Sequence, residues 1–309
     1  NAGNAVVPAV AVAPNYLAAD KFTNPGTTAL TVVYTVVPVT AAGCLGDAKT
    51  ITITIGAEPV GANDTKSICS KSAVTYDLQN NIHTLGNAFT SNFSWIAAPN
   101  ANVGGESTTA QGGAMITDVL TNVTNADQVV VYTVTPSGIN GCTGKPFTVS
   151  VTVRPEPVGV NDVATINSDI ILNYNLQNNV NTLGNNLPAN FSWVAAINSN
   201  VGGESTAPQA GSMITDVLNN ITNANQTVVY TVVPTGTNGC TGNPFIITVT
   251  VLPEPRGFND NVTVNSNAVI NYSLQNNVNS GGNSVPATFV WQAADNPLVT
   301  GESLAPQAS

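Results

Sequence analysis

The sequence predicts an all-β protein made of several similar β-sandwiches joined end to end. Its 309 residues are enough for two or three domains, since single domains usually have about 100 to 200 residues. The same motifs recur at a fixed spacing along the chain, and between them apolar and polar residues alternate in short runs separated by turn residues.

The composition excludes several classes of protein. Charged residues are only 8% of the chain, and its 26 glycines and 19 prolines are typical of short strands and many turns. A hydrophobic content of 42% argues against disorder. The net charge is −10, with no basic residue from Val158 to Pro255, so nucleic acid is a poor partner. We expect no membrane insertion, because no apolar run is long enough, and the opening from Asn1 to Pro14 lacks the positive start of a signal peptide.

A repeat of 98 residues organises the chain. A Glu-Pro pair begins at Glu58, Glu156 and Glu254, and in the two later copies it lies within Pro-Glu-Pro. This predicts the C-terminal half of a repeat at 1–59, complete repeats at 60–157 and 158–255, and the N-terminal half of a repeat at 256–309. We therefore expect the natural polypeptide to continue as a longer array. Other residues keep the same spacing: Tyr34, Tyr132 and Tyr230; Cys44, Cys142 and Cys240; Trp95, Trp193 and Trp291.

Strands are predicted where apolar residues recur at every second position. The clearest run is Phe147 to Val153, and similar runs cover Ile170 to Leu176, Phe191 to Ala195 and Val228 to Val233. The segment that begins at Met213 is too short and too rich in Asn for a helix, so a strand and a turn are expected there. About seven such strands in just under 100 residues, with one Trp near the middle, is the pattern of a seven-stranded immunoglobulin-like sandwich. The Pro-containing linkers favour a semi-rigid, extended string of domains.

The cysteines predict a disulfide and no zinc site. Each repeat has one Cys in a Gly-Cys-x-Gly turn, and with a single His in the chain this cannot form a zinc site. Cys69 is the one additional cysteine, and we expect it to pair with Cys142, which would close one domain. In an ideal sandwich, however, these two turns lie at opposite ends. Either Cys69 precedes a displaced second strand, or the pair stays reduced.

No catalytic residues are predicted. His83 is the only histidine, and the two later repeats have Asn181 and Asn279 in its place, so a general base is absent wherever the unit repeats. Repeated, nearly identical sites without a base fit no reaction template, and we expect a protein that is not an enzyme.

Calcium is the one cofactor for which the sequence contains candidate ligands. Acidic residues flank each junction between repeats, and hard cations bind such oxygen ligands. The alternative is that the Asn-Asp pairs at these places form turns through hydrogen bonds to the backbone. Two acids per junction are few for a cation that takes six to eight oxygens. The candidate ligands are Glu58 and Asp64, Glu156 and Asp162, and Glu254 and Asp260.

Two long, nearly duplicate strings resemble a known family. VVYTVTPSGINGCTGKPFTVSVTVRPEPVG and VVYTVVPTGTNGCTGNPFIITVTVLPEPRG are similar to the PKD-like repeats of very large cell-surface proteins of Bacteroidota, including gliding-motility adhesins of the SprB type. The resemblance implies secretion by the type IX route and display outside the cell, on its surface, as a long filament that contacts other surfaces or polysaccharide. The family motif is structural and implies no functional side chains.

The predicted function is that of a structural or adhesive segment, with neighbouring repeats, polysaccharide or other filament chains as partners. One alternative is a glycan-binding array, although each Trp alternates with a Phe as a core residue does. Another is a spacer within a polysaccharide-degrading enzyme. The half repeats could be completed by the same chain or by another chain through strand donation.

Overall fold

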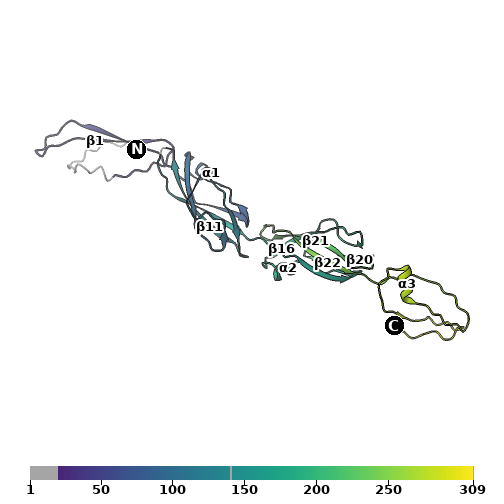
Figure 1. Cartoon of the computed structure of the whole chain (residues 1–309). Coiled ribbons are helices and arrows are strands. Elements are labelled where there is room, and N and C mark those ends of the chain that lie inside the picture. The colour runs from purple at the N-terminus through teal and green to yellow at the C-terminus, as the bar shows by residue number, and fades with distance from the viewer. Residues whose placement is uncertain (1–19, 140, 309) are drawn as a thin grey trace. The chain divides into compact units, whose positions relative to one another are not determined.

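The computed structural model describes residues 20–139 and 141–308, which are mainly β-strands with a few short helices (Figure 1). The chain divides into two compact units, Asn1–Pro155 and Glu156–Ser309. The segment Asn1 to Pro14 and the first part of the predicted 1–59 domain lie outside the described residues. Within the described ranges, no helix has the length and apolar character needed to cross a bilayer.

The complete repeat in the first unit has a five-stranded sheet, in which the first and last long strands of the repeat are parallel neighbours. All other neighbours in this sheet are antiparallel. The order across the sheet is β3 (Asp64–Cys69), β12 (Phe147–Arg154), β11 (Gln128–Gly138), β6 (Ser91–Ala97) and β8 (Gln111–Gly112).

Short strands and one helix complete this repeat. A three-stranded sheet contains β4 (Ser72–Ala73), β10 (Val119–Asn122) and β7 (Val103–Gly104), and a two-stranded pair contains β5 (Tyr76–Asp77) and β9 (Met115–Ile116). Helix α1 (Leu78–Leu85) follows β5, and its N-cap is Asp77, whose side chain accepts a hydrogen bond from Asn80 N. Buried side chains of β5, β7, β9, β10 and α1 join those of β6, β11 and β12 in one hydrophobic core.

Alternation explains why these residues form these strands. Along β12, Phe147, Val149, Val151 and Val153 are buried, and the residues between them are half-buried. The inward row packs around Trp95, whose ring meets Tyr132 edge to face at 5.7 Å. A one-residue shift in register would place the polar row in the core.

The complete repeat in the second unit has the same arrangement. Its five-stranded sheet has the order β13 (Asp162–Asn167), β22 (Phe245–Leu252), β21 (Gln226–Gly236), β16 (Ala189–Ala195) and β18 (Gln209–Ala210). The short elements are β14 (Ile170–Ile171), β20 (Val217–Asn220), β17 (Val201–Gly202), β15 (Tyr174–Asn175), β19 (Met213–Ile214) and α2 (Leu176–Thr182). Its hydrophobic core is separate from that of the first complete repeat.

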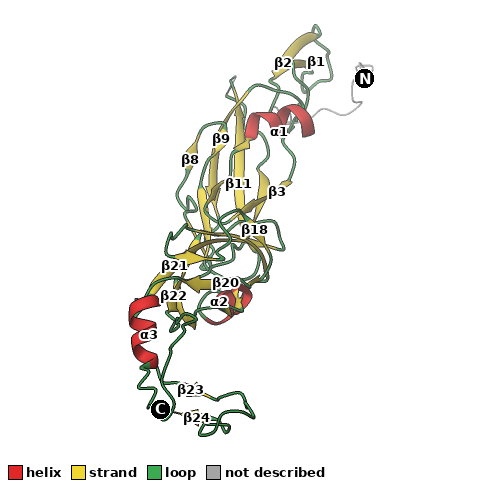
Figure 2. Ribbon diagram, turned by 90° about the vertical axis from the view of Figure 1, so that its right-hand side faces the viewer, coloured by secondary structure: helices red, strands yellow, loops and turns green. Residues whose placement is uncertain are grey.

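The remaining described residues have fewer regular elements. Residues 20–59 form the antiparallel hairpin β1 (Leu30–Val36) and β2 (Lys49–Ile55). Residues 256–308 contain α3 (Leu274–Gly281) and the short pair β23 (Val290–Trp291) and β24 (Gln307–Ala308). Figure 2 shows α1, α2 and α3 as short helices among strands and loops.

The predicted all-β sandwich is confirmed, and two details of the prediction are wrong. Each complete repeat has ten strands instead of about seven, because turns interrupt them; Thr75, with φ of 45°, separates β4 from β5. The expected strand from Ile170 to Leu176 ends early, because Asn175 caps a helix that begins at Leu176. The strand and turn expected after Met213 are confirmed as β19 and β20.

Candidate functional site at the repeat junctions

The residues that join one repeat to the next are held by side-chain amides. Asn87 follows helix α1, and its Nδ2 donates to the Glu58 carbonyl at 2.9 Å. Its Oδ1 accepts from Val60 N at 3.0 Å. One side chain therefore binds the linker on both sides of Pro59, in the way that a neighbouring strand would.

The same amide reaches back into the preceding half repeat. Asn87 Nδ2 lies 2.8 Å from the Pro25 carbonyl and 3.1 Å from that of Gly26. The linker is tied to the same place, since Glu58 N donates to the Asn24 carbonyl at 3.1 Å. Asn24 is 2% exposed and donates to the Ile55 carbonyl, which fixes its turn to the end of β2. The linker is thus bonded to the repeat before it and to the repeat after it.

The arrangement recurs at the other copies of the motif. Asn185 Nδ2 donates to the Glu156 carbonyl at 2.7 Å, and Val158 N donates to its Oδ1 at 2.9 Å. Asn283 bonds the Glu254 carbonyl at 2.7 Å and accepts from the Arg256 backbone N–H at 3.0 Å. Asn283 also donates to the Thr222 carbonyl at 3.2 Å. The 98-residue period places Thr222 where Gly26 lies in the first half repeat, so the contact to the preceding repeat recurs as well.

A second asparagine fixes the start of each repeat. Asn81, which is 2% exposed, exchanges hydrogen bonds of 3.0 Å with both backbone groups of Ala62 and donates to the Tyr76 hydroxyl at 2.8 Å. Tyr76 in turn donates to Asp64 Oδ2 at 2.5 Å. Burial, together with this bond, raises the pKa of Tyr76 to about 12. Asn179, Tyr174 and Asp162 form the same chain of bonds, as do Asn277, Tyr272 and Asp260.

Two glycines allow the linker to lie close to its own repeat. A Cβ on Gly86, just after α1, would be 1.7 Å from the Val60 carbonyl oxygen. A Cβ on Gly144, in the turn before β12, would be 1.9 Å from the Pro59 carbonyl oxygen. Gly184 is equivalent to Gly86, and a Cβ there would be 1.7 Å from the Val158 carbonyl oxygen. Side chains at these positions would push the linker away, so glycine is required by space.

The predicted calcium ligands do not assemble into a site. The described residues contain no group of three or more acidic, histidine or cysteine side chains suited to a metal ion. Asp64 already accepts from Tyr76 through Oδ2 and from Thr65 N through Oδ1, and Asp162 and Asp260 are bonded in the same way. Glu254 pairs with Arg256 at 3.2 Å. The turn-forming alternative does not describe these pairs either, because Asp64 and Asp162 begin strands β3 and β13 and Asn63 Oδ1 accepts from Thr148 N of β12.

The predicted disulfide between Cys69 and Cys142 is wrong. Cys69 is disulfide-bonded, as is Cys240, whereas Cys142 carries a thiol. The parallel pairing of β3 and β12 explains this, because it places Cys69 beside Arg154 at the end of β12, and Cys142 precedes the start of that strand. The two cysteines therefore lie at opposite ends of the sheet, beyond the reach of a disulfide.

The other side chains considered from the sequence lie where a structural role places them. His83 is exposed in the last turn of α1. Trp95 and Trp193 are 5% and 6% exposed, which confirms their interpretation as core residues. The asparagines that bond the linkers were not predicted, although Asn81 and Asn87 recur at 98-residue spacing. Asparagine is so common in this chain that its recurrence carried little signal.

Comparison with known proteins identifies one family model. A model of the PKD-like domain matches residues 9–59, 66–157, 164–255 and 262–309. The predicted boundaries after residues 59, 157 and 255 stay predictions. No curated protein matches the chain.

Several solved structures are similar at low identity. A 2,6-sialyltransferase of Photobacterium sp. JT-ISH-224 matches at 14% identity over 36% of this chain and 21% of its own, with a TM-score of 0.21. Chicken CNTN1 FN1–FN3 domains match at 9% identity over 72% of this chain and 76% of theirs, with a TM-score of 0.29. Drosophila N-cadherin EC1-4 matches at 10% identity over 74% and 59%, with a TM-score of 0.22. The chain thus spans less than two thirds of the first and third of these structures.

Proposed function

Because the chain belongs to the PKD-like domain family, we propose that it is a structural, adhesive segment of a long secreted filament or stalk on a cell surface. Domains of this family are typical of extracellular proteins. In this role the repeats provide length, and the junctions determine how one repeat follows the next.

The observation that carries the proposal is the repeated junction. Asn87, Asn185 and Asn283 bind their linkers through the same pair of backbone groups, one residue on each side of a proline. A linker bonded in this way loses much of the freedom of an ordinary connection between domains. A spacer benefits from such joints, because each added repeat then extends the chain by a reproducible step.

The use made of the polar side chains supports a role without catalysis. The carboxylates at the repeat starts accept hydrogen bonds from tyrosine and backbone donors, and the asparagines are bonded to the linker. In the cores, Tyr132 and Tyr230 donate to Asp118 and Asp216, and burial raises the pKa of both tyrosines. These groups are engaged in holding the fold, and we propose that the chain is not an enzyme.

The finer assignment rests on the sequence resemblance. The two strings that contain Pro-Glu-Pro are similar to repeats of giant surface proteins of Bacteroidota, so we propose a gliding-motility adhesin of the SprB type, exported by the type IX route. Its partners would be neighbouring repeats, surface polysaccharide or other filament chains. Nucleic acid is a poor partner for a chain with seven basic residues and a net charge of −10.

Immunogold labelling of intact cells tests this function. An antibody raised against residues 60–157 should label unpermeabilised cells of the producing organism, with gold particles extending away from the envelope. An antibody to a cytoplasmic protein, used on the same cells, controls for leakage. Label that appears only after permeabilisation would overturn the proposed surface display.

Titration with polysaccharides separates the proposal from a glycan-binding array. Trp95 and Trp193 are in the cores, so their fluorescence should not respond to added sugar. Trp291 is 41% exposed, and a Trp291→Phe variant removes the signal of that residue as a matched control. Saturable quenching that survives this substitution would favour a lectin. A spacer within an enzyme would instead be recognised by a catalytic domain elsewhere in the same natural polypeptide.

A further inference from the structure

The five-stranded sheet of the second complete repeat has one long edge strand with an open side. Within the part of the chain that the structure describes, β13 pairs with β22 alone. The opposite edge strand, β18, has two residues, and the edge strands of the three-stranded sheet, β14 and β17, have two residues each. A long strand with unpaired backbone groups is the part of a sheet to which another chain adds most readily.

The backbone groups of β13 that face the open side belong to every second residue. Ser168 N, directly after β13, donates to the Leu252 carbonyl at the end of β22 at 3.0 Å. Because the backbone groups of successive residues in a strand point to opposite sides, the even-numbered residues of β13 bond β22 and the odd-numbered residues face away from it. All of the odd-numbered residues have exposed side chains, and they are Val163, Thr165 and Asn167.

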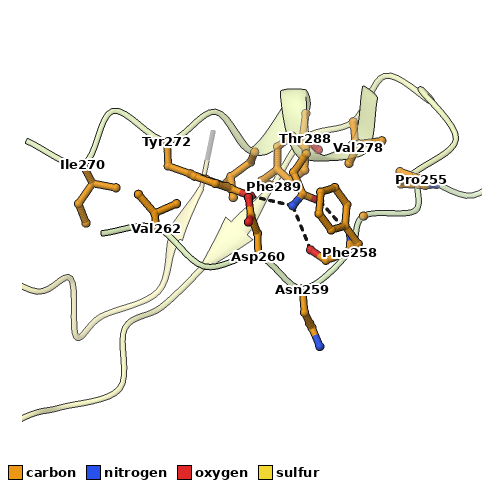
Figure 3. A pocket seen from close by; sticks show the side chains of 14 residues that line it. Pro255, Phe258, Asn259, Asp260, Val262, Ile270, Tyr272, Val278, Thr288 and Phe289 are labelled. Atoms are coloured by element: carbon orange, nitrogen blue, oxygen red, sulfur yellow. Dashed lines mark hydrogen bonds between the residues drawn. The ribbon is translucent and has the colours of Figure 1, made fainter. Parts of the chain in front are cut away.

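One of these outward backbone groups is already bonded. Val163 N donates to Asp162 Oδ1 at 2.8 Å. The other carboxylate oxygen of Asp162 accepts from the Tyr174 hydroxyl at 2.5 Å, which fixes the carboxylate at the start of the strand. Figure 3 shows the equivalent residues Asp260 and Tyr272 beside each other in the next copy of the motif. An added strand would therefore meet a Val163 N–H that already has an acceptor.

The remaining outward groups fit an antiparallel copy of the same strand. Thr165 presents both its N–H and its C=O to the open side, so two Thr165 residues placed opposite each other would form two hydrogen bonds. In this register, Asn167 N of each strand lies opposite the Val163 carbonyl of the other and donates to it, which adds two more. The pairing needs no bond from Val163 N.

We infer that β13 pairs with the β13 strand of a second copy of this chain, antiparallel, about a two-fold axis at Thr165. The two five-stranded sheets would then join into one continuous sheet. The contact is isologous, because the same strand is used on both chains, and it is complete with two chains. In the proposed filament this pairing would join one chain to another side by side, and it rests on that proposed function only for its setting.

The charges along β13 allow this pairing. Its one charged residue is Asp162, and in the antiparallel register the two Asp162 residues would be six residues apart along the sheet, about 20 Å. This exceeds the screening length of about 8 Å at physiological salt. Asp169 follows β13 in a turn, and its carboxylate accepts from Asn219 Nδ2 of β20, in the three-stranded sheet, at 2.6 Å. The two strands would therefore meet through uncharged side chains.

The equivalent edge strand of the first complete repeat, β3, is protected by a lysine. Lys66 occupies the position of Ala164 and lies on the same face of the sheet as buried Val151, its neighbour in β12. Its Nζ donates to the Thr75 carbonyl at 2.8 Å. A strand added at this edge would cover the ammonium group, and an inward-pointing charge is one of the ways in which edge strands avoid pairing. Ala164 has no charge and packs against the core. Of the two edges, β13 is therefore the one suited to a second chain.

Sedimentation velocity on the 309-residue chain tests the pairing. The wild type should change from a monomer to a dimer as the concentration rises and should form nothing larger. Ala164→Lys introduces into β13 the residue that β3 has naturally, so the fold should tolerate it, and association should weaken at least about tenfold. Ala164→Ser, which is small and uncharged, is the control and should associate as the wild type does.

Proline on the axis tests the backbone contacts directly. Thr165 N faces away from β22, so Thr165→Pro leaves the ladder between β13 and β22 intact and removes the donors of the two central hydrogen bonds. This variant should stay monomeric. Ser67→Pro is the matched control, because Ser67 is the equivalent residue of β3. It should associate as the wild type does, and circular dichroism checks that both variants are folded.

A cysteine on the axis provides a covalent readout. Opposed residues that exchange backbone hydrogen bonds have Cα atoms about 5.5 Å apart, which is within the range of a disulfide. Thr165→Cys should form a covalent dimer under mild oxidation, whereas Ser67→Cys, with the same other cysteines, should not; non-reducing electrophoresis separates the two. A wild-type chain that stays monomeric at all concentrations would overturn the pairing without bearing on surface display. So would wild-type association in Ala164→Lys and Thr165→Pro, or equal crosslinking of the two cysteine variants.

Discussion

At the scale of single residues, the amide side chain is the main structural device at the repeat junctions. It has donors and an acceptor on one planar group, so Asn87 can bond a carbonyl and an N–H of the same linker. A carboxylate offers only acceptors and a hydroxyl only one donor. Asparagine at this position therefore bonds the backbone of the linker through both a donor and an acceptor, as a neighbouring strand does elsewhere in the sheet.

Asn87→Ala should loosen the first junction. The variant loses four hydrogen bonds, and we expect a loss of about 1–3 kcal/mol in the free energy of unfolding. Backbone ¹⁵N relaxation should show increased motion at residues 58–60. Asn87→Asp should be at least as harmful, because a carboxylate would face three carbonyl oxygens. Asn80→Ala, on the exposed side of α1, is the control, and equal effects in both alanine variants would contradict this role of Asn87.

Stability should fall in strong base because of Tyr76 and Tyr174. Burial and the bond to aspartate raise the pKa of each from 10.0 to about 12 in the folded chain. The stabilisation is fully present below pH 10 and is lost as the pH rises through about 12, because the unfolded state releases the proton first. Melting temperatures from pH 8 to pH 12 measure this, and the Tyr76→Phe, Tyr174→Phe double variant should show a shallower decline. An ultraviolet titration in which both tyrosines ionise near pH 10 would contradict the prediction.

At the scale of elements, the alternation of apolar and polar residues predicted the long strands. Turn residues and helix caps determined where the shorter strands and helices lie. Phe147 to Val153 alternates cleanly and forms β12 with the expected face inward. The run from Ile170 alternates as well, yet the chain turns at Asn173, with φ of 49°, and a helix begins after Asn175. Alternation over a few residues cannot exclude a cap and a helix, since an N-cap asparagine is also a common turn residue.

The candidate site was predictable only in part. The Glu-Pro repeat marked the junctions, but the Asn-Asp pairs lie at the starts of strands and not in turns, as Asp64 at the start of β3 and Asp162 at the start of β13 show. The disulfide prediction failed because it depends on how distant segments meet, whereas calcium binding at the junctions stays a prediction. The parallel pairing of β3 with β12 separates Cys69 from Cys142, and no local pattern in the sequence encodes that pairing.

Gly86→Ala should damage the packing of helix against linker. The added Cβ would be 1.7 Å from the Val60 oxygen and 2.8 Å from its carbonyl carbon, so the backbone has to move. We expect a cost of about 1–3 kcal/mol in a urea unfolding experiment. Gly104→Ala is a suitable control, because a Cβ there meets nothing within 4 Å. Equal free energies of unfolding for the two variants would contradict this prediction, because they would show that the linker backbone moves aside without loss of stability.

At the scale of the whole molecule, the two complete repeats have the same architecture with separate cores. Leu120 is fully buried in one core, and Leu218 occupies the same position in the other. Repeat proteins of this kind gain length by copying one unit, and each unit keeps its own hydrophobic core. Damage to one repeat is then confined to that repeat.

Leu120→Ala should lower the unfolding temperature of one repeat and leave the other unchanged. The expected loss is about 2–5 kcal/mol for a buried leucine. Differential scanning calorimetry should then resolve two transitions, and Leu218→Ala should produce the same splitting from the other repeat. A single transition that shifts as a whole would indicate that the two repeats unfold together.

The parallel neighbours β3 and β12 have a mechanical consequence. The chain enters the repeat at the start of β3 and leaves it at the end of β12, and six residue pairs from Asp64–Val149 to Cys69–Arg154 lie between these points. A pull on the two ends of the repeat therefore loads the pairs in shear, all at once, whereas an antiparallel hairpin pulled from one end would unzip bond by bond. Such a repeat resists tension through its topology, which suits a tether under load.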